Sequence, residues 1–229
     1  MQNLVDISFQ LSIIGGLISV LCGAYLVNLW RKQETRIITD IPLMFGGTFM
    51  AIGLNFIVMG AMNIGLIPDT MEFFRLRTLF LISGSVIPLF VAILHIWFAR
   101  FRKYFPHAVV TLSGYWAIAS LFGPTEQVIM LLLIPPMICN IIAVTITFGI
   151  TWKTGRLKEV RSDLLVVAAI LLMISQIGKL FLGTMGLEYV ADLISAVGII
   201  IGSLGLSNPW YRRGAKTKVA EAHTPTQLA

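Results

Sequence analysis

Residues 127–151 read QVIMLLLIPPMICNIIAVTITFGIT and contain no charged side chain. A helix needs about 20 mostly apolar residues to cross a hydrocarbon core about 30 Å thick, so this stretch predicts a transmembrane helix. A strand is not expected, because the stretch is too long, does not alternate and would leave open sheet edges in lipid. The stretch therefore predicts an α-helical membrane protein.

Six further stretches of the same kind lie on either side of it. The seven predicted crossings span residues 8–30, 41–67, 76–99, 106–122, 127–151, 163–185 and 189–208. We therefore predict the all-α class: one polytopic membrane domain, residues 1–213, built as a bundle of seven transmembrane helices. The remaining residues, 214–229, are polar, and we expect them to form a disordered cytoplasmic tail.

The composition excludes several other classes of protein. Of the 229 residues, 57% are hydrophobic and 12% are charged, whereas soluble domains are roughly half apolar and about a quarter charged. The net charge is +6, but the charges fall in short blocks between apolar runs, which excludes a disordered chain and a nucleic-acid-binding domain. The lipid bilayer is the expected partner. Cys22 and Cys139 both lie in apolar runs, so neither a disulfide framework nor a metal site is expected.

The basic residues predict the orientation of the chain. All of the 17 Lys and Arg residues except Arg75, Arg77 and Lys179 follow the first, third, fifth or seventh crossing. Since cytoplasmic loops carry an excess of basic residues, we expect the N-terminus outside, the C-terminus in the cytoplasm and a multi-pass protein of the cell membrane. Arg75 and Arg77 are expected in a solvated outer loop with Asp69 and Glu72, or, as an alternative, at an anion gate.

The two ends of the chain resemble each other. Residues 28–50 align with residues 149–173 so that Trp30 falls on Trp152, and HIWFAR (95–100) falls on NPWYRR (208–213). This pattern predicts a parallel 3+1+3 internal repeat, with residues 8–100 as the first repeat, 106–122 as a linker helix and 127–208 as the second repeat. Such an arrangement resembles SWEET-type transporters. The alternative is that any two membrane hairpins with Trp and basic residues at their ends look alike.

Small and weakly polar residues recur every three to four positions on four crossings, which marks the faces that point into the bundle. Pro88 and Pro135–Pro136 each remove a backbone donor, so the freed carbonyls need a partner or line a wet cavity. We therefore expect a central polar pocket between the third, fifth, sixth and seventh crossings. The faces are Ser12, Gly16, Ser19 and Gly23; Ser85, Pro88, Ala92 and His95; Pro136, Asn140, Ala143 and Thr147; and Asp192, Ser195, Gly198, Gly202 and Gly205.

Ionisable and amide side chains within the crossings are the candidate ligand-binding residues. A lysine at a helix centre costs about 2.5 to 3.5 kcal/mol to insert, and Lys179 forms one polar stripe with Ser175 and Gln176. Lys179 is expected either to bind or gate a ligand, or to snorkel outward or pair with Asp192 or Glu188. The full candidate set is Lys179, Gln176, Asn140, Asp192, Ser175, Asn55 and His95. Asn55 and Asn140 are as well suited to bridging helices as to binding a ligand. For His95 the alternative is a place at the membrane interface.

No Walker-type loop, catalytic-triad spacing or pair of intramembrane carboxylates is present in the sequence. An enzyme is therefore less expected than a binding or transport protein, and no catalytic residue, metal or cofactor is predicted.

Residues 69–100 read DTMEFFRLRTLFLISGSVIPLFVAILHIWFAR and follow a first crossing with a basic end and a Gly-rich second crossing. This pattern resembles the seven-helix N-terminal sensory regions of prokaryotic histidine kinases and cyclases. The resemblance implies a sensor. The chain departs from that group after Arg213, because GAKTKVAEAHTPTQLA is too short and too polar for a kinase or cyclase domain. Output would then pass to a separate cytoplasmic or membrane protein.

Three functions are left open by the sequence. The first is a membrane sensor or receptor-like module that binds a small or lipophilic ligand within the helix bundle. The second is a small-solute transporter in which two three-helix repeats rock around a site at mid-membrane. The third is an accessory subunit whose role is packing within a larger membrane complex.

Overall fold

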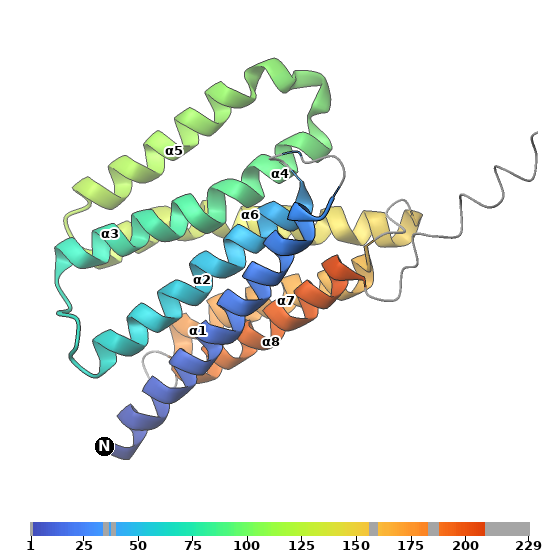
Figure 1. Cartoon of the computed structure of the whole chain (residues 1–229). Coiled ribbons are helices and arrows are strands. Elements are labelled where there is room, and N and C mark those ends of the chain that lie inside the picture. The colour runs from blue at the N-terminus through green and yellow to red at the C-terminus, as the bar shows by residue number, and fades with distance from the viewer. Residues whose placement is uncertain (1, 34–36, 38–39, 156–159, 183–187, 209–229) are drawn as a thin grey trace, which may run out of the picture.

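The computed structural model describes residues 2–33, 37, 40–155, 160–182 and 188–208. Within these ranges every regular element is a helix (Figure 1). The elements in chain order are α1 (Gln2–Arg31), α2 (Ile41–Asn63), α3 (Met71–Leu81), η1 (Ile82–Val86), α4 (Ile87–Trp97), η2 (Ala99–Tyr104), α5 (Phe105–Phe122), α6 (Glu126–Thr154), α7 (Ser162–Leu182) and α8 (Glu188–Ser207).

Among the described residues, six helices are long and apolar enough to cross a membrane. They coincide with the first five predicted crossings and the seventh. The sixth predicted crossing corresponds to α7, whose described apolar stretch, Ser162–Gly178, is shorter. The chain is therefore a multi-pass membrane protein. The predicted tail, residues 214–229, and the part of the repeat alignment beyond Asn208 lie outside the described residues.

The third predicted crossing begins earlier than expected. The hydroxyl of Thr70 accepts a hydrogen bond from Phe73 N at 3.3 Å and caps α3, so the helix begins at Met71. A Thr cap followed by an acidic residue in the first turn, here Glu72, is a favourable helix start. The prediction that Arg75 and Arg77 lie in a solvated loop is therefore wrong, because both are part of α3 and partly buried.

The same rod contains a π-helical turn, η1, at its middle. Ile87 N donates to Ile82 O, five residues back, in place of the usual four. Pro88 follows directly and has no N–H to give to the preceding turn, and single π turns are often found where the regular ladder is interrupted. Helices α3, η1 and α4 nevertheless continue along one direction in Figure 1.

Glycine pairs allow α1 and α2 to pack closely. A Cβ atom added to Gly53 would lie 2.6 Å from Gly16 O, and one added to Gly23 would lie 2.6 Å from Gly46 O. Small residues at such positions let two backbones approach in lipid, where van der Waals packing drives helix association. The faces predicted on α1 and α8 are buried, and α8 packs against both α1 and α7.

Two hydrophobic clusters lie beside the interior space of the bundle. In the first, the Phe45 ring meets Phe49 and Phe148 edge to face, with centroids 6.0 and 5.8 Å apart, and this links α2 to α6. The second surrounds Trp116 of α5 and includes Phe74 of α3. Helix α5 packs against α3, α4 and α6 and lies away from α1, α7 and α8 (Figure 1).

Candidate ligand-binding cavity

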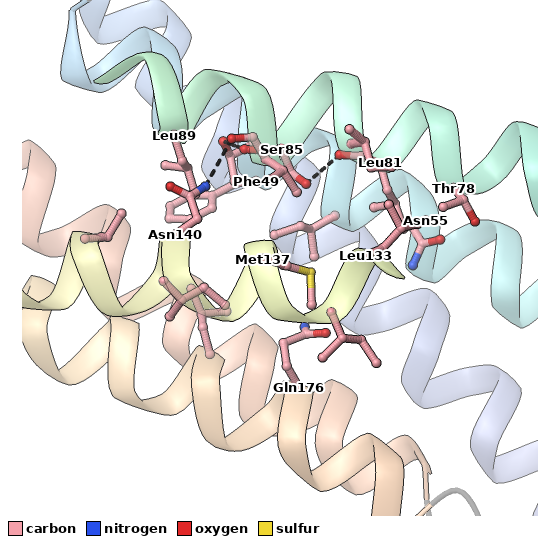
Figure 2. A pocket seen from close by; sticks show the side chains of 18 of the residues that line it. Phe49, Asn55, Thr78, Leu81, Ser85, Leu89, Leu133, Met137, Asn140 and Gln176 are labelled. Atoms are coloured by element: carbon pink, nitrogen blue, oxygen red, sulfur yellow. Dashed lines mark hydrogen bonds between the residues drawn. The ribbon is translucent and has the colours of Figure 1, made fainter. Parts of the chain in front are cut away.

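A cavity of about 380 Å³ lies inside the bundle, where the two hydrophobic clusters meet. Its wall is formed by α2, the α3–η1–α4 rod and α6, with Trp116 from α5 and residues of α7 and α8 (Figure 2). Most of the lining side chains are aliphatic or aromatic. The polar ones are Thr48, Asn55, Arg77, Thr78, Ser85, Asn140 and Gln176.

Asn140 is held between the cavity and the π-helical turn. Its Nδ2 donates to Val86 O at 3.1 Å, and the side chain is 7% exposed (Figure 2). A carbonyl oxygen can only accept, so the amide nitrogen must face Val86 and Oδ1 must point the other way. Within the described part of the chain, no donor reaches this buried Oδ1. An unsatisfied buried acceptor costs about 1 to 3 kcal/mol, so Asn140 offers a site for a hydrogen-bond donor.

Asn55 contributes a second buried amide, from α2. It is also 7% exposed, and no donor among the described residues reaches its Oδ1. Asn140, through its bond to Val86 O, bridges two helices, and this is one of the two alternatives that the sequence predicted for it. Gln176 extends from α7 toward Met137 of α6 in Figure 2.

Three hydroxyl groups on the wall have already used their protons. The hydroxyl of Thr78 donates to Phe74 O at 2.8 Å, and that of Ser85 donates to Leu81 O at 2.5 Å. The Thr48 hydroxyl lies 2.9 Å from Met44 O and 3.3 Å from Ser85 O. A hydroxyl has one proton and two lone pairs, so each of these oxygens retains acceptor capacity only.

Arg77 alone is charged among the described residues that line the cavity. Its guanidinium carbon lies 5.3 Å from the centre of the Phe74 ring, and Nη1 lies 3.5 Å from Met62 Sδ. A cation over an aromatic face is stabilised by the ring quadrupole. Neighbouring Arg75 donates from Nη2 to Gly123 O at 2.9 Å, which ties α3 to the turn between α5 and α6.

Two of the predicted site residues, Asp192 and Ser175, take part in two polar contacts away from the cavity, one between α1 and α8 and one between α7 and α8. The hydroxyl of Ser12 donates to Asp192 Oδ2 at 3.2 Å, and that of Ser175 donates to Ala191 O at 2.7 Å. Both contacts are buried, and neither Asp192 nor Ser175 lines the cavity. The side chain of Lys179 lies outside the described residues, so its pairing with Asp192 stays a prediction.

His95 also lies away from the cavity wall. Its Nδ1 is 2.9 Å from Val91 O of the same helix, and its ring meets Phe105 edge to face at 4.9 Å. These contacts are those of a histidine packed between α4 and the start of α5, and its expected place at the membrane interface stays a prediction.

The position of the pocket was predicted in part. The expected helices do line it, as the α3–η1–α4 rod, α6, α7 and α8, but the wall is mainly apolar rather than polar. Helix α2, from which the sequence singled out only Asn55, supplies a further side. Thr48, Phe49 and Trp116 were missed as lining residues. One of the carbonyls freed by proline has a partner in the protein, which is the first of the two predicted alternatives. Leu132 O, which Pro136 leaves without its helical donor, accepts from the Tyr115 hydroxyl at 3.1 Å.

No family model, curated protein or solved structure matches the chain. The described side chains also contain no group of three or more His, Cys, Asp or Glu suited to a metal ion.

Proposed function

We propose that the chain is an integral membrane receptor-like module that binds a small lipophilic ligand in the cavity of its helix bundle. The observation that carries this proposal is the cavity itself: about 380 Å³, mainly apolar, with the amide oxygens of Asn55 and Asn140 on its wall, which no donor in the described part of the chain reaches. Sites for small molecules are typically apolar hollows of about 300 to 1,000 Å³ with a few placed polar groups.

The proposal includes a route from ligand to signal. Asn140 contacts both the cavity and the η1 turn, through Val86 O, and Trp97 Nε1 near the end of α4 donates to Thr147 Oγ1 of α6 at 2.6 Å. A ligand at Asn140 would change the position of α4 against α6, a helix shift of the kind that many receptors use. π-helical turns are frequent at functional sites. The receiver would be a separate cytoplasmic or membrane protein.

We also propose the finer topology of seven crossings, with α7 as the sixth, an outside N-terminus and a parallel 3+1+3 repeat. The support is the distribution of basic residues after alternate crossings. In this orientation Arg77 lies near the outer end of the cavity, and Leu89 lies nearer the cytoplasm.

Native mass spectrometry of the full chain tests the binding proposal. We expect the protein purified in nanodiscs to retain a lipophilic molecule through mild activation. Met137→Trp would fill the cavity and remove the adduct, whereas the matched change Met137→Leu would keep it, because only the first takes up the space; the melting temperature of each variant checks that it is folded. No retained adduct, or an equal adduct in Met137→Trp, would contradict the proposal.

A transporter is the second candidate. It is favoured by the cavity lining, which brings Asn55 from the first predicted repeat opposite Asn140 and Gln176 from the second, as expected for a substrate site between repeats. Uptake of a panel of sugars, amino acids and ions into liposomes separates the two functions. A transporter moves at least one of these solutes, and Asn140→Leu stops the movement. A receptor moves none of them.

A further inference from the structure

We infer that the ligand of this cavity is a neutral lipophilic molecule with a hydroxyl or N–H donor, bound with its donor on Asn140 Oδ1. The inference rests on the proposed function and names the chemistry of the ligand. Its basis is the direction in which each polar group on the wall can bond.

The wall around the η1 turn offers acceptors. Asn140 directs its amide nitrogen to Val86 O and uses one of its two N–H donors there, so Oδ1 points the other way, and no described donor reaches it. The hydroxyls of Thr78 and Ser85 donate to carbonyls of their own helix, so only their lone pairs remain. A hydrogen-bond acceptor on the ligand would therefore face other acceptors on this part of the wall. A hydrogen-bond donor on the ligand would face acceptors that it can satisfy.

An anionic ligand such as a fatty acid fits less well. No described Asp or Glu lines the cavity, and its one cation, Arg77, already lies over Phe74 and against Met62 Sδ. A carboxylate placed beside Asn140 Oδ1 would be desolvated without a donor there, and burying an unpaired charge is costly. A neutral alcohol avoids this cost and satisfies the buried amide.

The experiment compares isomers that differ in the donor. The probes are 11-bromo-1-undecanol and 1-bromo-10-methoxydecane, which contain the same atoms, and 11-bromoundecanoate as the anion. Bromine quenches indole fluorescence on contact, and Trp116 lies on the cavity wall with 1% exposure. Quenching is measured for the full chain in phosphatidylcholine nanodiscs, corrected for partition into nanodiscs without protein, and Trp116→Phe identifies the part due to Trp116.

We expect the alcohol to bind about three- to tenfold more tightly than its isomeric ether, as one neutral hydrogen bond predicts. In Asn140→Leu this ratio should fall to about one, while Thr145→Val, a control on the same helix whose hydroxyl bonds only Ile141 O, should keep it. The comparison of the two isomers in the unmodified chain needs no variant to fold.

Each other outcome has a distinct meaning. Equal binding of alcohol and ether in the unmodified chain overturns the donor inference and leaves the lipophile cavity standing. Tighter binding of the carboxylate, lost in Arg77→Met, overturns it in favour of an anion. If none of the three probes quenches Trp116, the proposed function itself fails.

Discussion

Asn55 and Asn140 are equally buried, but within the described ranges only Asn140 has a hydrogen bond to another helix. In lipid an interhelical hydrogen bond contributes about 1 kcal/mol, whereas a buried polar group without a partner lowers stability. Substitutions of the two residues therefore distinguish an amide that stabilises the fold from one that is available only to a ligand.

We expect Asn140→Leu to lower the free energy of unfolding of the ligand-free protein by about 1 kcal/mol, because Val86 O loses its donor. Asn55→Leu should leave it unchanged or raise it, because the substitution removes an unsatisfied acceptor from an apolar wall. Unfolding of the delipidated protein in mixed micelles measures both. Equal losses in the two variants would contradict the bonding described for them.

Arg77 shows the effect of a helix-start signal that the loop prediction did not use. Two arginines next to Asp69 and Glu72 are typical of a solvated loop, and the sequence predicted one. The cap at Thr70 moves the helix start back to Met71, which turns Arg77 toward the cavity. Pro68 and Thr70 followed by an acidic residue were the available signal for this start.

At the scale of the helix, glycines matter only where another backbone is close. Gly53 and Gly47 lie on the same helix, α2, and a Cβ on Gly53 would meet Gly16 O at 2.6 Å, whereas one on Gly47 would meet nothing within 4 Å. We expect Gly53→Ala to destabilise the protein by about 1 to 3 kcal/mol, through forced separation of α1 and α2.

Gly47→Ala is the matched control for that change. It should be neutral or stabilising by up to about 1 kcal/mol, since alanine favours a helix over glycine. Unfolding midpoints of the two variants in the same lipid test the pair. Similar losses in both would show that helix propensity, and not the α1–α2 contact, sets the cost.

Tyr115 and Pro136 should be coupled, because the proline removes the helical donor of Leu132 O and the tyrosine hydroxyl replaces it. We expect Tyr115→Phe to cost about 1 kcal/mol in the unmodified chain and close to nothing beside Pro136→Ala, where residue 136 regains its N–H. A double-mutant cycle on the free energy of unfolding measures this. Additive effects would rule out the compensation.

Sequence patterns predicted the elements better than the space between them. The periodic small residues of α1 and α8 are buried as expected, because helical spacing determines which side chains share a face. The same spacing says nothing about how far apart two helices stand. The place of Thr48 and Phe49 in the cavity wall depends on that distance and could not be read from the sequence, which singled out only Asn55 on α2.

The proposed topology of the whole molecule places lipid around the helix bundle and the N-terminus outside the cell. In a background without Cys22 and Cys139, we expect Asp69→Cys to react with an impermeant maleimide on intact cells and Gln33→Cys to react only after lysis. The reason is that basic residues hold the loop after α1 in the cytoplasm. Labelling of Gln33→Cys on intact cells would invert the topology.

We propose that the cavity between α2, the α3–η1–α4 rod, α6 and α7 holds a lipophilic ligand. A density map of the full chain, purified in nanodiscs with its native lipids, would show whether it does. We expect an elongated density in the cavity that comes within hydrogen-bond distance of Asn140 Oδ1. A cavity closed by side chains, or one that contains only ordered water, would contradict it.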